Sequence, residues 1–416
     1  MDWLRALAAI LVVMLHAAIP YMSHPLPGLY WSIPAIERSD VVNLLGWAID
    51  GFVMPVFFIM NGYFAARLLQ QRGAGAFLRH RLSRIGGPFL LACALILPMD
   101  LYIWMTGWVI CDLISMDELL ALKIHSDIGD ALHGVSHLWF LQYVLLYCLG
   151  ACWLSQLWQH WHVDTPEKGP SNKHQDRAAQ SHARSFGSRL AIAILPLLAG
   201  ILVAGSILWW QPRIVIGFRH HWVPMWENLI FYLVPFSLGW FWERHSSARL
   251  LPEFRWGVQL VLAGLAFVVM WPELVQHLNH ESIPMIRARV PFLFAAFGIL
   301  MSTGLFGGLL SLPLRRVPAA IAYLSKASFW IYLFHHPVVA LMQVNLLHVR
   351  TTPLIKFGLS ALVGVLFCLL TYEGLVRKTV LGQILNGVRE QSGATLSLAH
   401  AEQTHAKAAA RQIPAA

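Results

Sequence analysis

Ten apolar segments recur along this chain of 416 residues, each close to the length that a helix needs to cross a lipid bilayer. A membrane-spanning helix takes about 20 mostly apolar residues and satisfies its backbone hydrogen bonds internally. We therefore predict an all-α, polytopic integral membrane protein with about ten transmembrane helices. Their expected bounds are 3–22, 42–66, 85–108, 136–157, 190–210, 225–242, 256–274, 290–311, 327–348 and 354–376.

Composition and charge support this class and favour one orientation. Hydrophobic residues make up 57% of the chain and charged residues only 12%, whereas soluble domains carry about 25% charged residues. The net charge of +9 comes from Lys and Arg that gather in alternate loops, as the positive-inside rule describes. This pattern predicts N-in/C-in topology, with the lipid bilayer, not nucleic acid, as the partner.

The domain organisation follows from where the polar stretches lie. We expect one membrane domain over residues 1–376, interrupted by a polar cytoplasmic linker at 158–189, and a disordered cytoplasmic tail over 377–416. No signal-peptide pattern precedes the first segment, so this segment is expected to stay in the mature protein. The cysteines form no C-x-x-C pair and fit packing better than a metal or disulfide framework; they are Cys93, Cys111, Cys148, Cys152 and Cys368.

The first segment carries two polar residues, Arg5 and His16, eleven positions apart. At about 100° and 1.5 Å per residue, this spacing returns to nearly the same helix face, roughly 16 Å along the axis. An ionisable group at the bilayer centre costs on the order of 2.5–3.5 kcal/mol, which makes each of them a functional candidate. The alternative for His16 is an imidazole that only packs against a neighbouring helix.

Three further motifs carry candidate residues. FLRHRLSRIGGP places Arg79, Arg81 and Arg84 at a cytoplasmic helix start, where Arg residues three apart share a face and can bind phosphates. The positive-inside rule alone would also explain them. Two other motifs, SHLWFL and SFWIYLFHHP, hold residues of the outer half: His137, Trp139, Tyr332 and His335. The neighbouring His336 should point about 100° away from His335, so a single site would use only one of the two.

Taken in order, the motifs DWLR with R-x10-H, PVFFIMNGYF, FLRHRLSRIGGP, SHLWFL and SFWIYLFHHP resemble the membrane acyltransferase-3 family over almost the whole membrane part. The resemblance implies an O-acyltransferase that moves an acyl group from cytoplasmic acyl-CoA to hydroxyls of an extracytoplasmic glycan. It is nearest to members that succinylate periplasmic glucans, which favours a succinyl group. The co-substrate would be succinyl-CoA or acetyl-CoA, and no permanently bound cofactor is implied.

The resemblance and the residue chemistry together give expected roles. His16 would be the general base for the sugar hydroxyl, or alternatively an acyl-carrying nucleophile. Arg5 would face the CoA phosphates or the thioester, and the phosphates would be held by Arg81 and Arg84, with Arg79 beside them. The glycan site would be lined by His137, Trp139, Tyr332 and His335.

Three other interpretations stay open. The first is an O-acetyltransferase of another envelope polysaccharide, such as O-antigen or an exopolysaccharide. Arg5 is the only Lys or Arg well inside a segment, so no second cation is evident for a succinyl carboxylate. The second is a transporter or flippase of a modified sugar. The third, a metal centre of His16 with His335 or His336, is disfavoured because no carboxylate or cysteine accompanies them, and no metal is expected.

Overall fold

The computed structural model describes residues 1–26, 29–34, 37–122, 124, 134–161, 186–212, 221–245, 256–279, 289–311, 317–379, 381–382 and 385. Within these ranges the secondary structure is helical, and the β-structure is limited to an isolated bridge between Met22 and Ser39. The predicted all-α class is therefore confirmed.

Each of the ten predicted segments coincides with a long helix in the described ranges. These helices are α1 (Asp2–Ala18), α2 (Asp40–Arg81), α3 (Gly87–Ile110), α6 (Trp139–Trp161), α8 (Phe186–Trp210), α10 (Trp226–Arg244), α12 (Trp256–Asn279), α13 (Arg289–Ser311), α14 (Ala319–Leu346) and α15 (Pro353–Thr371). Short elements join them: η1 (Ile19–Tyr21), η2 (Leu82–Gly86), α4 (Met116–Ala121), η3 (Ser136–Leu138) and η5 (Tyr372–Val376).

Six helical stretches of the described residues are long and apolar enough to cross a membrane: Asp2–Tyr21, Asp40–Ile110, Ser136–Leu157, Trp256–Asn279, Arg289–Ser311 and Pro353–Val376. Together with the composition, these stretches identify a multi-pass membrane protein. The count of ten crossings and the N-in/C-in orientation stay predictions.

Several predicted bounds differ from the observed ones; the ninth helix, α14, begins at Ala319 and not at 327. The segment predicted at 42–66 is part of α2, which continues to Arg81 with a kink at Gly73, where φ is +72°. Hydropathy identifies only the apolar part of a helix, so it could not predict that α2 continues beyond residue 66 through polar residues. The helices also take up both ends of the predicted linker, since α6 ends at Trp161 and α8 begins at Phe186. The rest of the linker, 162–185, and most of the predicted tail lie outside the described residues.

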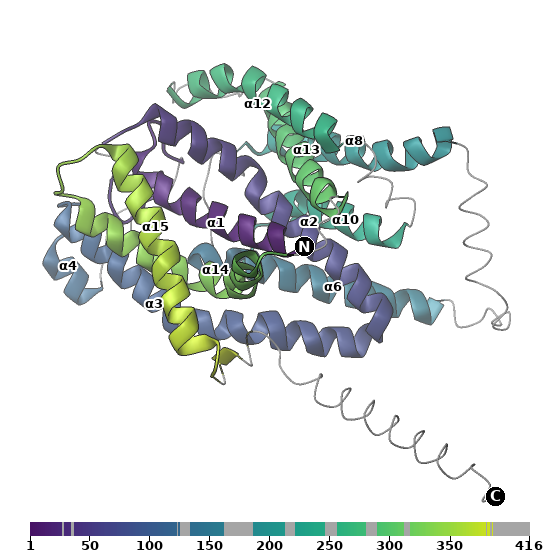
Figure 1. The fold of residues 1–416 in the computed structure, drawn as a ribbon, viewed down its shortest axis with the longest axis horizontal. Coiled ribbons are helices and arrows are strands. Elements are labelled where there is room, and N and C mark those ends of the chain that lie inside the picture. Colours follow the sequence, from purple (N-terminus) through teal and green to yellow (C-terminus); the bar gives the residue numbers. More distant parts are fainter. Residues whose placement is uncertain are drawn as a thin grey trace, which may run out of the picture.

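Helix α1 lies inside the bundle and not on its outer surface (Figure 1). Ten of its 17 residues are buried, and it packs against α14, α2 and α15. Its many small residues allow close approach of these neighbours, as is usual where membrane helices pack. His16 of α1 is therefore enclosed by protein.

Close packing also fixes α2 against α10. At their crossing, a Cβ added to Gly62 would overlap the Phe236 carbonyl, and one added to Gly239 would overlap the Ile59 carbonyl. Glycine is required at both positions because the two backbones touch. The crossing holds the middle of α2, which lines the cavity described below.

Candidate functional site

A cavity of about 870 Å³ lies between α1, α2, η2, α6 and α14, at the end of the bundle where α1 begins. Its volume is in the range of roughly 300–1,000 Å³ that is typical of small-molecule sites. Aromatic side chains form its inner wall, among them Phe57, Phe140, Phe329 and Tyr332. The cavity is therefore large enough for a cofactor-sized ligand with a polar end and an apolar end.

The polar end of this cavity is strongly basic. Among the described residues that line it, Asp2 carries the carboxylate, which accepts a hydrogen bond from Ser325 Oγ at 2.8 Å. Five basic side chains outweigh it: Arg5, Arg67, Arg81, Arg84 and Lys326. Such an excess of cations favours a ligand that carries several negative charges.

Two of these arginines have buried N–H groups without an acceptor among the described residues. Arg81 ends α2 and Arg84 lies in the π-helical turn η2, so both reach the cavity. Among the described residues, Arg81 Nε and Arg84 Nη1 are buried and have no hydrogen-bond partner. Guanidinium donors without a protein acceptor suit phosphate oxygens. Arg79 is exposed and is not among the residues that line the cavity.

Arg5 and His16 lie at different places along α1. Arg5 is exposed to the cavity, and its Cζ lies 5.2 Å from the Phe64 ring centroid. His16 is 9% exposed and lies between two histidines of α14. Its ring centroid is 4.9 Å from that of His335 and 4.8 Å from that of His336. The prediction that one site would use only one of these two histidines is wrong, because His16 comes from a facing helix and contacts both.

Hydrogen-bond partners assign the proton positions in this group. His335 Nδ1 lies 2.9 Å from the carbonyl oxygens of Ile331 and Tyr332, which can only accept, so Nδ1 carries the hydrogen and Nε2 the lone pair. That Nε2 is 3.0 Å from His16 Nδ1, which is also 2.9 Å from the Val12 carbonyl. With two acceptors facing it, His16 Nδ1 carries the hydrogen. The lone pair of His16 is then on Nε2.

Two prolines leave backbone carbonyl oxygens near this cluster free to accept hydrogen bonds from side chains. Proline lacks the N–H that would bond the carbonyl four residues before it. Pro337 thereby frees the Leu333 carbonyl, to which His137 Nε2 donates at 3.0 Å. Pro20 likewise frees the His16 carbonyl, which accepts from Gln343 Nε2 at 3.1 Å. Backbone groups that would otherwise stay unbonded thus fix the side chains around His16.

Asp100 of α3 is the carboxylate of this cluster. It is fully buried, and its Oδ1 accepts from His336 Nδ1 at 2.7 Å while Oδ2 accepts from Ser136 Oγ at 2.9 Å. One ligand atom each of Asp100, His137 and His336 lies within 4.8 Å of the others. The premise that no carboxylate accompanies the histidines is therefore wrong, and the absence of a metal stays a prediction.

Tyr332 connects the cavity to the histidines. Its ring lines the cavity, and its hydroxyl donates to the His137 carbonyl at 2.5 Å. Its ring centroid lies 5.9 Å from that of His137 and 6.3 Å from that of His335. Tyr332 was expected among the glycan-contacting residues of the outer half, whereas the structure places it on the wall shared with Arg5.

Trp139 lies apart from the histidines, although the sequence grouped it with them. Its ring centroid is 5.0 Å from that of Tyr232 and 5.3 Å from that of Tyr143, in an aromatic group that also includes Phe58. The structure thus brings His137 and His335 to His16 but places Trp139 in a separate group.

Sequence reasoning missed four residues of the cluster. A carboxylate inside an apolar segment indicates a functional residue, so Asp100 could have been predicted from the sequence. His336 was set aside on helix geometry. Trp31 and Gln343 carry no such signal: Trp31 Nε1 donates to Gln343 Oε1 at 2.5 Å, and its ring stacks on that of His16 with centroids 5.8 Å apart.

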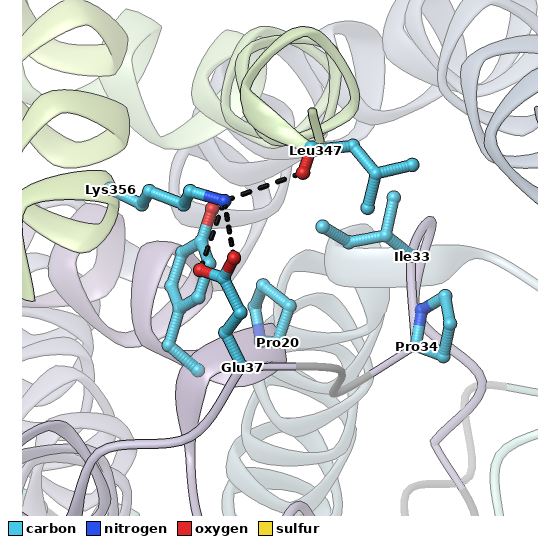
Figure 2. Close-up of a pocket in the computed structure, with 7 residues that line it drawn as sticks. Pro20, Ile33, Pro34, Glu37, Leu347 and Lys356 are labelled. Carbon is cyan, nitrogen blue, oxygen red and sulfur yellow. Dashed lines mark hydrogen bonds and ion pairs between the residues drawn. The ribbon is translucent and has the colours of Figure 1, made fainter. Parts of the chain in front are cut away.

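A buried cation lies near the start of the tenth predicted segment, and the premise that Arg5 is the only basic side chain well inside a segment left it out. Lys356 of α15 is 2% exposed. Figure 2 shows its ammonium group bonded to the Glu37 carboxylate, 2.9 Å away, and to the Leu347 carbonyl, 3.4 Å away. The neighbouring cavity, with a volume of about 30 Å³, has room for little more than one water. Lys356 is thus neutralised by Glu37.

Comparisons with known proteins identify the family of the chain. The family described as "Acyltransferase domain" matches residues 1–373. Glucans biosynthesis protein C of Escherichia coli O139:H28 is 24% identical over 401 residues, covering 93% of this chain and 94% of the relative. The protein of the same name from E. coli K12 is 25% identical over 400 residues, with the same coverage. No solved structure matches the chain.

Proposed function

The chain belongs to the acyltransferase-3 family, and from that premise we propose that it transfers an acyl group from acyl-CoA to hydroxyls of a periplasmic glucan across the bacterial inner membrane. The enzyme class follows from the family. We propose, in addition, the acyl-CoA donor, the glucan acceptor and the inner-membrane location. The succinyl group is favoured, with succinyl-CoA as the co-substrate.

One observation carries the mechanism: the lone pair of His16 is on Nε2, because the carbonyl of Val12 and Nε2 of His335 both face Nδ1. An imidazole held in one tautomer by its partners is ready to act as a general base. We infer that Nε2 of His16 accepts the proton of the acceptor hydroxyl as the hydroxyl attacks the thioester carbonyl.

The cavity supports acyl-CoA as the donor. The phosphates of CoA match the basic end, where Arg81 and Arg84 have free buried donors and Arg5 lies nearby. The aromatic inner wall suits the uncharged pantetheine arm, and it ends at Tyr332, next to the histidines. In this arrangement the thioester would approach the histidine cluster past Tyr332, and the guanidinium groups would remain with the nucleotide.

The acceptor is proposed from the relatives, whose name connects them with the biosynthesis of glucans. His137 is the residue of the outer motif that lies in the cluster, and we propose that it contacts the acceptor through Nδ1, which has no hydrogen-bond partner among the described residues. His335, expected beside it, is 0% exposed and has both ring nitrogens bonded, so we propose that it acts through His16. Trp139 and its aromatic group offer a separate apolar face that suits a sugar ring.

An acetyl group is the second candidate, and one observation favours it. A succinyl carboxylate would need a cation near the transfer site, and Lys356 is already paired with Glu37. The acceptor could then also be another envelope polysaccharide, such as O-antigen or an exopolysaccharide. The basic side chains of the cavity remain available for a carboxylate only if it stays near the CoA phosphates.

Mass spectrometry of periplasmic glucans from a deletion strain tests the proposal. The glucans should lack one acyl mass, which complementation with the wild-type chain restores and complementation with His16→Ala does not. A missing succinyl mass supports the favoured donor, and a missing acetyl mass supports the second candidate. Unchanged glucans contradict the acceptor.

Proteoliposomes separate an acyltransferase from a flippase that catalyses nothing. Purified protein receives radiolabelled succinyl-CoA or acetyl-CoA on one side and unmodified glucan on the other. Covalent label on the glucan supports the proposal. Movement of an already acylated sugar, without any transfer of label from CoA, contradicts it.

A further inference from the structure

Asp100 and His336 form a hydrogen-bonded pair directly behind the proposed base. His336 Nδ1 lies 2.7 Å from Asp100 Oδ1, and both side chains are at most 2% exposed. Three elements distant in sequence build the pair, because Asp100 lies on α3, His336 on α14 and the Ser136 hydroxyl, which binds the other carboxylate oxygen, on η3. A buried carboxylate held from both sides cannot reorient without losing hydrogen bonds.

The ring of His336 is enclosed by other rings. It stacks on His137 with centroids 4.5 Å apart and on Trp104 at 5.6 Å, and its centroid lies 4.9 Å from that of Trp31. At 1% exposure it is less accessible than His16, which is 9% exposed. His336 is therefore poorly placed to meet a substrate hydroxyl itself. It is well placed to act through His16, whose ring centroid is 4.8 Å away.

The charge on this cluster changes during the proposed reaction. The acceptor O–H bond breaks and its proton goes to His16 Nε2, the new C–O bond forms at the thioester carbonyl, and the C–S bond breaks to release the CoA thiolate. The proton then passes from His16 to the thiolate sulfur, so His16 is neutral before and after transfer. In between it is an imidazolium ion in a setting where an uncompensated charge is costly.

We propose that Asp100 and His336 are positioning residues that stabilise this imidazolium, with Asp100 as the counter-charge and His336 as the link to His16. The inference rests on the proposed function. In the part of the chain that the structure describes, the charged and titratable groups around His16 are His335 and His336 of α14, His137 of η3 and Asp100 of α3, and Asp100 is the anion among them. A fixed anion that faces a developing cation requires no rearrangement when the charge appears.

Asp100→Asn tests the proposal with a split between two kinetic constants. The amide keeps the size and one acceptor oxygen but removes the charge. In proteoliposomes with radiolabelled acyl-CoA and glucan, we expect kcat to fall about 100-fold or more, in the range seen for general-base catalysis. KM for acyl-CoA should stay within about threefold, because the basic cavity lies elsewhere. Asp100→Glu, which restores the charge, should recover at least about a tenth of the wild-type kcat.

A matched control removes a buried hydrogen bond away from the site. Thr303 Oγ1 of α13 donates to Gln259 Oε1 of α12 at 2.7 Å. Thr303→Val should lower thermal stability by an amount similar to Asp100→Asn and leave kcat unchanged. If Asp100→Asn does not fold, Ser136→Ala removes only one hydrogen bond of the carboxylate and should lower kcat about threefold to tenfold at constant KM.

The outcomes separate this proposal from the proposed function. Wild-type protein that transfers neither acyl group contradicts the proposed function itself. Transfer that depends on His16 but keeps more than a third of its kcat in Asp100→Asn, or is unchanged in a folded Ser136→Ala, overturns the positioning role alone. A third result also overturns it: activity that is lost on dialysis against EDTA and regained with Zn²⁺ would assign Asp100, His137 and His336 to a metal centre.

Discussion

Replacement of His335 tests the tautomer assignment of His16 quantitatively. His335→Leu keeps a similar volume but removes the Nε2 acceptor that lies 3.0 Å from His16 Nδ1. The Val12 carbonyl, 2.9 Å away, still accepts from Nδ1, so half of the constraint remains. One hydrogen bond contributes about 0.5–1.5 kcal/mol, and about 1.4 kcal/mol corresponds to a factor of ten. We therefore expect transfer to slow by roughly twofold to tenfold.

The assay measures initial rates of labelled acyl transfer in proteoliposomes at saturating acyl-CoA. His335→Gln is the matched control, since its side-chain oxygen can accept from His16 Nδ1 and should keep a rate nearer to wild type. A His335→Leu rate as low as that of His16→Ala would refute the reasoning. So would equal losses in His335→Leu and His335→Gln, because the acceptor atom would then be irrelevant.

Three other variants test the cavity, its inner wall and the helix packing. Arg81→Gln should raise KM for acyl-CoA about tenfold or more with little change in kcat, since a charge-assisted hydrogen bond contributes about 1.5–3 kcal/mol, whereas the exposed Arg79→Gln should change KM less than about twofold. Tyr332→Trp puts a larger ring between the cavity and the histidines, so kcat should fall while acyl-CoA binding, measured by calorimetry, persists. An unchanged kcat would contradict the proposal that the thioester passes Tyr332. Gly62→Ala should destabilise the protein by about 1–3 kcal/mol through overlap with α10, and a melting temperature equal to that of Gly264→Ala, where the added Cβ meets open space, would refute the tight crossing.

The helices could be predicted from sequence because their signal is local. A run of about 20 apolar residues predicts a helix without knowledge of its neighbours, and α12 and α13 begin within one residue of the expected start. The polar end of α2 could not be found in this way. Beyond residue 66 the chain leaves the apolar pattern, and the helix continues to Arg81 through residues that hydropathy does not register.

The candidate site was only partly accessible to sequence reasoning. Arg5 and His16 stand out because they interrupt an apolar segment, and Arg81 and Arg84 because they share a face; three of these four line the cavity. The contacts of His16 with His335 and of Asp100 with His336 join residues 319 and 236 positions apart. Such pairs depend on how the helices pack, which no local pattern encodes.

The central claim is that the imidazole of His16 accepts the proton of the acceptor hydroxyl. Its most direct test is the kcat of purified His16→Ala in proteoliposomes with labelled acyl-CoA and glucan, alongside calorimetric binding of acyl-CoA. The account predicts a loss of about 10²–10⁴-fold in kcat with acyl-CoA binding preserved. Near-normal transfer by the folded variant would contradict it.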